Sequence, residues 1–252
     1  MNKARWRIAA LAWFTFQQLW KEKFFLIPLG LGLLVIVILG FLGQLSYVEP
    51  GRVAAAFLLL GSELFLVLMG TSVAAFLTRT TLRGPCGISF LTQAYPRWTF
   101  FCGLQLGLVL FLALMALVFF GILSFFSIAL GSHQPLLPLA EALMLLVAEA
   151  ALLGALVMWA GFWVNPFLAC ALGLCVFLLG HVREAVTTTY SGVGLLWYCV
   201  PQLAWLSRSE DAVFGIAVPG IRFGELLCYA VVFLLFFSLC GIFSYERKDI
   251  HP

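Results

Sequence analysis

Charged side chains are scarce in this sequence. Only 10% of its 252 residues are Asp, Glu, Lys or Arg, whereas 63% are hydrophobic and the mean hydropathy is +1.09. Soluble globular domains carry about 25% charged and about 45–50% apolar residues. The composition therefore excludes a soluble globular domain and predicts a polytopic membrane protein.

The sequence also lacks the short motifs of phosphate-binding, metal-dependent and redox sites. It contains no Gly-x-x-x-x-Gly-Lys-Ser/Thr loop and no His-Glu-x-x-His, and its seven cysteines include no Cys-x-x-Cys pair. No basic stripe with aromatic residues indicates a nucleic-acid partner. We expect that this chain is not an enzyme and that it binds neither a metal nor a cofactor.

Long hydrophobic runs are what the sequence has instead, and six of them reach or approach the roughly 20 residues that a membrane-spanning helix needs. The six predicted spans are Phe24–Leu45, Val53–Leu77, Phe100–Leu130, Leu139–Val164, Phe167–Gly180 and Glu225–Ser244. The fifth is short unless residues 182–186 extend it. We predict an all-α fold with six transmembrane helices in a single transmembrane domain, residues 1–252.

Residues 1–23 form an amphipathic stretch with five basic residues at its two ends. A signal peptide would also begin with basic and then apolar residues, but this stretch is rich in aromatic residues and Gln, and no small-x-small cleavage site follows. We interpret it as a helix that lies in the membrane interface with its apolar face down.

The distribution of Lys and Arg predicts the orientation of the chain. With six spans, ten of the 14 Lys and Arg residues lie on the side of the termini, in residues 1–23, 78–99 and 245–252. Because Lys and Arg are enriched in cytoplasmic loops, both termini and the loop 78–99 are predicted to be cytoplasmic. Residues 181–224 then lie at the outer face, where their aromatic residues predict short helices or a re-entrant segment.

The loop 78–99 interrupts the apolar sequence between the second and third spans. Arg83-Gly84-Pro85 breaks the arriving helix, and Ile88–Ala94 offers about two helical turns before Pro96. This pattern predicts a short cytosolic coupling helix on which a partner docks.

Several segments resemble the permease subunits of ABC-2 type transporters, in particular the six-span kind associated with multi-copper enzyme maturation. The segments that carry the resemblance are Arg83-Gly84, Ile88-Ser-Phe-Leu and Pro96-Arg97-Trp98-x-Phe100-x-x-Gly103 in the loop, Leu196-Trp-Tyr-Cys-Val-Pro201-Gln-Leu in the outer segment, and Ile242–Ile250 at the end. Their order and placement match that family better than any single motif does.

The resemblance implies a permease subunit of an exporter in the bacterial cytoplasmic (inner) membrane. Such a subunit forms a homodimer or heterodimer in the lipid bilayer, and a separate ATPase subunit binds ATP and Mg²⁺. The residues implied in ATPase coupling are Arg79, Arg83, Ile88, Phe90, Leu91 and Arg97. The alternatives are a non-transporting membrane scaffold or assembly factor and an intramembrane enzyme; the substrate is not identified by the sequence.

Two carboxylates lie inside predicted spans, Glu63 in the second and Glu149 in the fourth. A charged residue at such depth costs about 2.5–3.5 kcal/mol on insertion scales, so each is expected to face a protein interior, a cavity or a partner. Together with Gln105 they are candidates for the translocation path. A structural hydrogen bond between helices, with Ser62, Gln105 or a protonated carboxyl group, is an equal alternative.

His181, Arg183 and Glu184 form a polar group at the end of the fifth span. A metal site there would need two or three further ligands, and His133 and His251 are the only other histidines. We therefore interpret this group as a charge cluster at the membrane interface.

Overall fold

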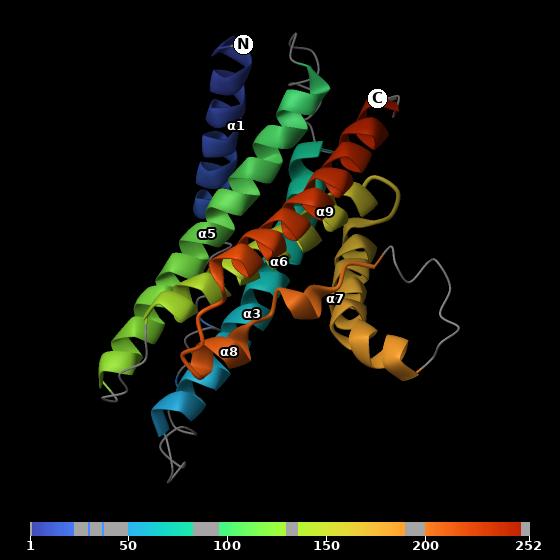
Figure 1. Ribbon diagram of the computed structural model, residues 1–252. Coiled ribbons are helices and arrows are strands. Elements are labelled where there is room, and N and C mark those ends of the chain that lie inside the picture. Colours follow the sequence, from blue (N-terminus) through green and yellow to red (C-terminus); the bar gives the residue numbers. More distant parts are fainter. Residues whose placement is uncertain are drawn as a thin grey trace.

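Helices make up almost all of the described structure (Figure 1). It is a computed structural model that describes residues 2–22, 30, 37, 50–82, 96–129, 136–189 and 200–247. Its long helices are α1 (Asn2–Lys21), α3 (Pro50–Leu77), α5 (Arg97–Ala129), α6 (Leu136–Ala160), α7 (Pro166–Thr189) and α9 (Gly220–Arg247). The shorter elements are the π-helical turn η1 (Thr78–Leu82), the 3-10 turn η3 (Leu203–Trp205) and α8 (Ser209–Val213). No strand occurs within these ranges.

Five of the helices, α3, α5, α6, α7 and α9, are long and apolar enough to cross a membrane. The chain is therefore a helical membrane protein. The first predicted span, Phe24–Leu45, lies outside the described residues. The fifth span is longer than the apolar run alone indicated, because α7 continues through the polar residues after Gly180 as far as Thr189.

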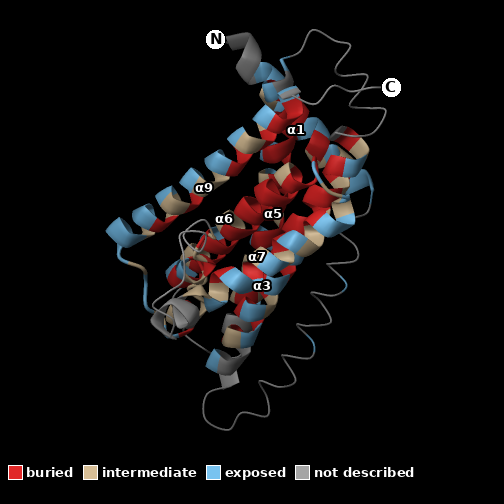
Figure 2. Cartoon of the chain, turned by 90° about the vertical axis from the view of Figure 1, so that its right-hand side faces the viewer, coloured by how far each residue is buried: buried red, intermediate tan, exposed pale blue. Residues whose placement is uncertain are grey.

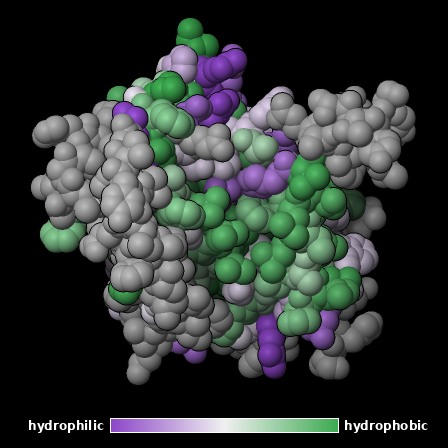
Figure 3. Space-filling model, turned by 90° about the horizontal axis from the view of Figure 1, so that it is seen from below, coloured by the Kyte–Doolittle hydropathy of each residue, from purple (hydrophilic) through white to green (hydrophobic). Residues whose placement is uncertain are grey.

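Helix α6 is the centre of the bundle. It packs against α3, α5, α7 and α9, and most of its residues are buried. Figure 2 shows the buried residues concentrated on α5 and α6, whereas α9 carries many exposed residues along its outer side. Figure 3 views the bundle from the end where α3 begins and shows apolar residues in the middle of the described surface, with polar residues around them.

Small residues bring α3 and α6 together at mid-bundle. A Cβ added to Gly70 of α3 would lie only 2.7 Å from the carbonyl oxygen of Ala150 on α6, so the two backbones are nearly in contact there. Gly154 lies one turn further along α6, and a Cβ there would lie 2.6 Å from Leu108 Cδ2 on α5. Close approach of this kind is the usual role of small residues between membrane helices.

Helix α1 occupies the predicted N-terminal stretch but packs lengthwise along the first half of α5. Gly103 of α5 abuts Leu11, and Gly107 abuts Thr15, so the two helices run parallel. This orientation differs from the one expected of a helix lying flat across the membrane surface. Gly103 and Gly107 therefore accommodate α1 of the same chain.

The two ends of the described chain lie at one end of the bundle, together with the last turn of α3 and the first turn of α5 (Figure 1). At this end η1 follows α3 directly, and the hydroxyl of Thr78 donates to the carbonyl of Ala74. The side chain of Arg79 in η1 is exposed. The segment that joins η1 to Pro96 therefore starts and finishes beside both termini.

Candidate functional site: a buried Glu-Glu-His cluster

Two carboxylates and one imidazole, far apart in the sequence, meet inside the bundle. His181 Nε2 lies 3.0 Å from Glu63 Oε1 and 3.9 Å from Glu149 Oε1. One ligand atom from each of the three side chains lies within 4.8 Å of the other two. We refer to Glu63, Glu149 and His181 as the Glu-Glu-His cluster.

Three helices supply one residue each to this cluster. Glu63 comes from α3, Glu149 from the middle of α6 and His181 from the last part of the α7 span. Gly173 allows α7 to approach the others, since a Cβ there would lie 2.5 Å from Val157 Cγ2 on α6. The same close packing that joins α3 to α6 thus determines how near the three polar side chains lie.

The imidazole of His181 is oriented by its own helix. Its Nδ1 lies 3.1 Å from the carbonyl oxygen of Phe177, which can only accept a hydrogen bond, so Nδ1 carries the hydrogen in this contact. The ring also packs on that of Phe177 with centroids 4.6 Å apart. Nε2 is consequently the ring nitrogen that faces both carboxylates.

Glu63 has a second partner in the segment between η3 and α8. Ser207 Oγ donates to Glu63 Oε2 at 2.8 Å, while Glu63 Oε1 faces His181. Each carboxylate oxygen of Glu63 therefore has a polar partner. Ser62, one of the partners considered from the sequence, instead donates to the carbonyl of Leu59 in its own helix.

The segment 200–207 is held between α7 and α9, where it covers the cluster. The Arg183 side chain donates to the carbonyl of Val200, and the backbone N–H of Gln202 donates to the hydroxyl of Tyr229 at 2.7 Å. Gly180 of α7 lies directly beneath Leu203, which is fully buried. These contacts explain how a polar segment between the last two spans reaches a carboxylate inside the bundle.

Glu149 is the member of the cluster whose carboxylate lacks hydrogen bonds in the described structure. Its side chain is fully buried, and neither carboxylate oxygen has a hydrogen-bond partner among the described residues. The Glu63 side chain is 6% exposed and that of His181 27%, so the imidazole is the most exposed member of the cluster in the described structure. A buried carboxylate is costly unless it is paired or coordinates a cation.

The structure brings together part of the predicted site. Glu63 and Glu149, predicted for a translocation path, do lie side by side, but Gln105 donates to the carbonyl of Ala151 at 3.3 Å and has no recorded contact with either carboxylate. His181 is packed against both carboxylates, which differs from the interfacial charge cluster expected for it. The Glu184 side chain is not described.

Sequence reasoning also missed Ser207, which lies 144 residues from Glu63. The sequence holds no signal for Ser207. For His181 the available signal was its position directly after an apolar run, because an ionisable residue within a span points to polar partners. Of the predicted coupling residues, Arg83, Ile88, Phe90 and Leu91 lie outside the described residues. The Arg97 side chain is likewise not described.

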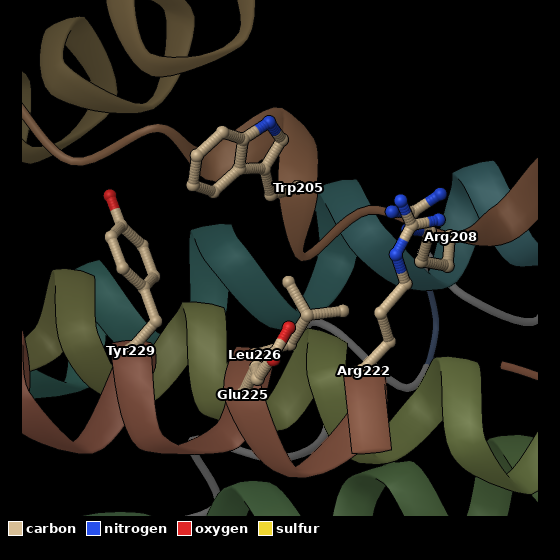
Figure 4. Close-up of a pocket in the computed structure, with 6 residues that line it drawn as sticks. All are labelled: Trp205, Arg208, Arg222, Glu225, Leu226 and Tyr229. Atoms are coloured by element: carbon tan, nitrogen blue, oxygen red, sulfur yellow. The ribbon is translucent and has the colours of Figure 1, made fainter. Parts of the chain in front are cut away.

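A second polar feature is a pocket of about 380 Å³ between the segment that follows η3 and the start of α9 (Figure 4). Its lining residues are Trp205, Arg208, Arg222, Glu225, Leu226 and Tyr229. Arg208 donates to Asp211 at 2.9 Å. The side chain of Arg222 extends from α9 toward Arg208 (Figure 4). The pocket and the Glu-Glu-His cluster use different faces of the same connecting segment.

Fold and site together define a helical membrane protein with a buried polar cluster of two carboxylates and one histidine. No family model matches the chain, and no curated protein matches it either. The resemblance to ABC-2 permeases therefore rests on the sequence segments given above.

Proposed function

We propose that this chain is the permease subunit of an exporter and that a separate ATPase subunit drives it. The observation that carries the proposal is the arrangement at one end of the bundle, where the ends of α3 and α5 that flank the basic loop 78–99 lie beside both termini (Figure 1). An ATPase bound at that end would contact the loop, α1 and α9 at once. No phosphate-binding loop occurs in this sequence, so ATP and Mg²⁺ would be bound by the partner.

Work from an ATPase reaches a permease only if the two conformations of the permease contact that partner differently. The predicted helix at residues 88–94 would transmit this difference, since it follows α3 and η1 along the chain. Helix α3 carries Glu63 and contacts α6, which carries Glu149. A shift of α3 would therefore change the spacing of the polar groups inside the bundle.

The test is whether the tagged full chain co-purifies with an ATPase subunit from its native membrane. We expect the double variant Phe90→Asp and Leu91→Asp to lose the ATPase, because each buried Phe or Leu side chain contributes about 1.5–3 kcal/mol and loss of both would weaken binding by more than about 100-fold. The matched control is Thr92→Asp with Gln93→Asp, which adds the same charge at neighbouring polar positions. Complex formation by the Phe90 and Leu91 variant at the wild-type level would overturn the proposal.

The Glu-Glu-His cluster favours one second candidate, an intramembrane enzyme. A carboxylate and an imidazole within hydrogen-bond reach are the groups that general acid–base catalysis uses. In that case the purified chain would hydrolyse a membrane-embedded substrate without any ATPase, and Glu149→Gln would abolish the activity. Stimulated ATP hydrolysis that requires both subunits would instead support the permease.

A further inference from the structure

We propose that the Glu-Glu-His cluster is a binding site for one divalent first-row transition metal ion of the Zn²⁺ class. The three side chains supply one nitrogen and two carboxylates, from three different helices, to a common point. Imidazole and carboxylate together form the ligand set of many zinc sites, in which three protein ligands leave a fourth position for water. Metal binding by this cluster requires no partner subunit and is independent of the proposed transport function.

The distances fit such an ion. Oxygen and nitrogen ligands bind Zn²⁺ at about 2.0–2.2 Å, so tetrahedral ligand atoms lie about 3.4 Å from one another. The two distances from His181 Nε2, 3.0 Å to Glu63 and 3.9 Å to Glu149, lie on either side of that value. All three donor atoms lie within 4.8 Å of one another, so coordination of one ion would require the carboxylates to rotate toward it.

The surroundings of the ligands also match those of a metal site. A metal-binding histidine usually donates its other ring N–H to a carbonyl or carboxylate, as His181 Nδ1 does to Phe177. The free oxygen of Glu63 is held by the Ser207 hydroxyl, which is a common arrangement for a ligating carboxylate. The donor atoms are thus oriented before any ion binds.

The negative charge of the two carboxylates is a further, independent reason to expect a cation at this point. His181 Nε2 and Glu63 Oε1 lie 3.0 Å apart, so a positive centre, either a proton on Nε2 or a metal ion, lies between the two atoms. The fully buried carboxylate of Glu149 has no hydrogen-bond donor among the described residues and faces the same point. One divalent cation would neutralise both carboxylates and engage the imidazole.

The test uses the tag-free full chain, purified in detergent, freed of metal by chelation and titrated with Zn²⁺. We expect about one tightly bound zinc per chain and little competition from Mg²⁺, which prefers octahedral oxygen ligands. Glu149→Gln and His181→Gln should abolish this binding, whereas Ser207→Ala should weaken it by about 10–100-fold because only the orientation of Glu63 is lost. The matched control is Glu225→Gln, an exposed carboxylate in the separate pocket, which should bind zinc as the wild type does.

Cobalt provides a second measurement of the same site. Co²⁺ bound to one imidazole and two carboxylates should give visible d–d absorption that Zn²⁺ displaces, and Glu149→Gln should remove it. Absence of zinc binding to the wild type would overturn the proposal, and so would wild-type affinity in folded Glu149→Gln. If neither the Glu149 nor the His181 variant folds, Ser207→Ala decides: unchanged zinc affinity in that variant overturns the proposal.

Discussion

Replacing Gly70 by alanine tests whether close packing of α3 on α6 holds the bundle together. The added Cβ would lie 2.7 Å from the carbonyl oxygen of Ala150, while ordinary contacts begin at 3.4 Å, so the helices must separate by 0.7 Å at this point. The atom in the way belongs to a helix backbone and cannot rotate aside. Overpacking of this kind costs about 1–3 kcal/mol.

Alanine also has a higher helix propensity than glycine, by about 0.8–1.0 kcal/mol, and this gain partly offsets the overpacking. The matched control is Gly121→Ala in α5, since a Cβ there would meet no other atom within 4 Å. Both variants gain the same propensity. The difference between them therefore isolates the overpacking at Gly70, about 1–3 kcal/mol in favour of Gly121→Ala.

The measurement is the unfolding of each purified variant in the same detergent, by heat and by denaturant. For 150–250 residues a change of 1 kcal/mol shifts Tm by about 2–4 °C, so Gly70→Ala should melt several degrees below Gly121→Ala. Equal stability of the two variants would show that α3 and α6 do not approach as closely as the structure has them. The positions of Glu63 and Glu149 relative to each other would then be wrong as well.

Two further predictions concern the segments that pack around the bundle. Tyr229→Phe removes the hydroxyl that accepts from the Gln202 N–H, so the segment 200–207 should be cleaved faster by protease, with a loss of stability of about 1 kcal/mol; unchanged cleavage would contradict this role. Gly103→Ala places a Cβ 2.6 Å from Leu11 Cβ, so α1 should separate from α5, as measured by disulfide cross-linking of cysteines introduced on the facing surfaces of the two helices; wild-type cross-linking would contradict the packing.

The sequence alone was sufficient to predict the spans that the structure describes, because a bilayer requires long apolar runs. The limits of α7 were the exception. Its apolar run ends at Gly180, yet the helix continues to Thr189, where the segment 200–207 packs on Gly180 and accepts a hydrogen bond from Arg183. A span that is covered by protein can include polar residues that lipid would not accommodate.

The arrangement of the helices could not be predicted in the same way. Helices α5 and α6 are apolar on all sides, so no periodic stripe shows which face meets which neighbour. The information lies in single small residues such as Gly70, Gly103 and Gly173, whose roles emerge only when the partner helix is known. Glycine is common in membrane helices, and the sequence offers no means to rank one position above another.

The candidate site was predicted in part for a related reason. Glu63 and Glu149 stand out in apolar runs because burial of a carboxylate is costly. A carboxylate at such a position therefore indicates a polar partner even when the sequence does not show where that partner lies. His181 stands at the end of an apolar run, where a solvated position is equally compatible with its sequence. Ser207 gives no signal, because one hydroxyl in a connecting segment resembles any other.

The cost of the cluster is itself informative. Helices α3 and α6 would pack more favourably with apolar side chains at Glu63 and Glu149, since replacing a buried polar set by hydrophobic residues is often stabilising. The chain nevertheless carries both carboxylates and surrounds them with His181, Ser207 and the covering segment. Residues that merely joined the helices would be expected to satisfy one another, yet Glu149 has no hydrogen-bond partner among the described residues. An incomplete polar set of this kind is better explained by a ligand that completes it than by a role in folding.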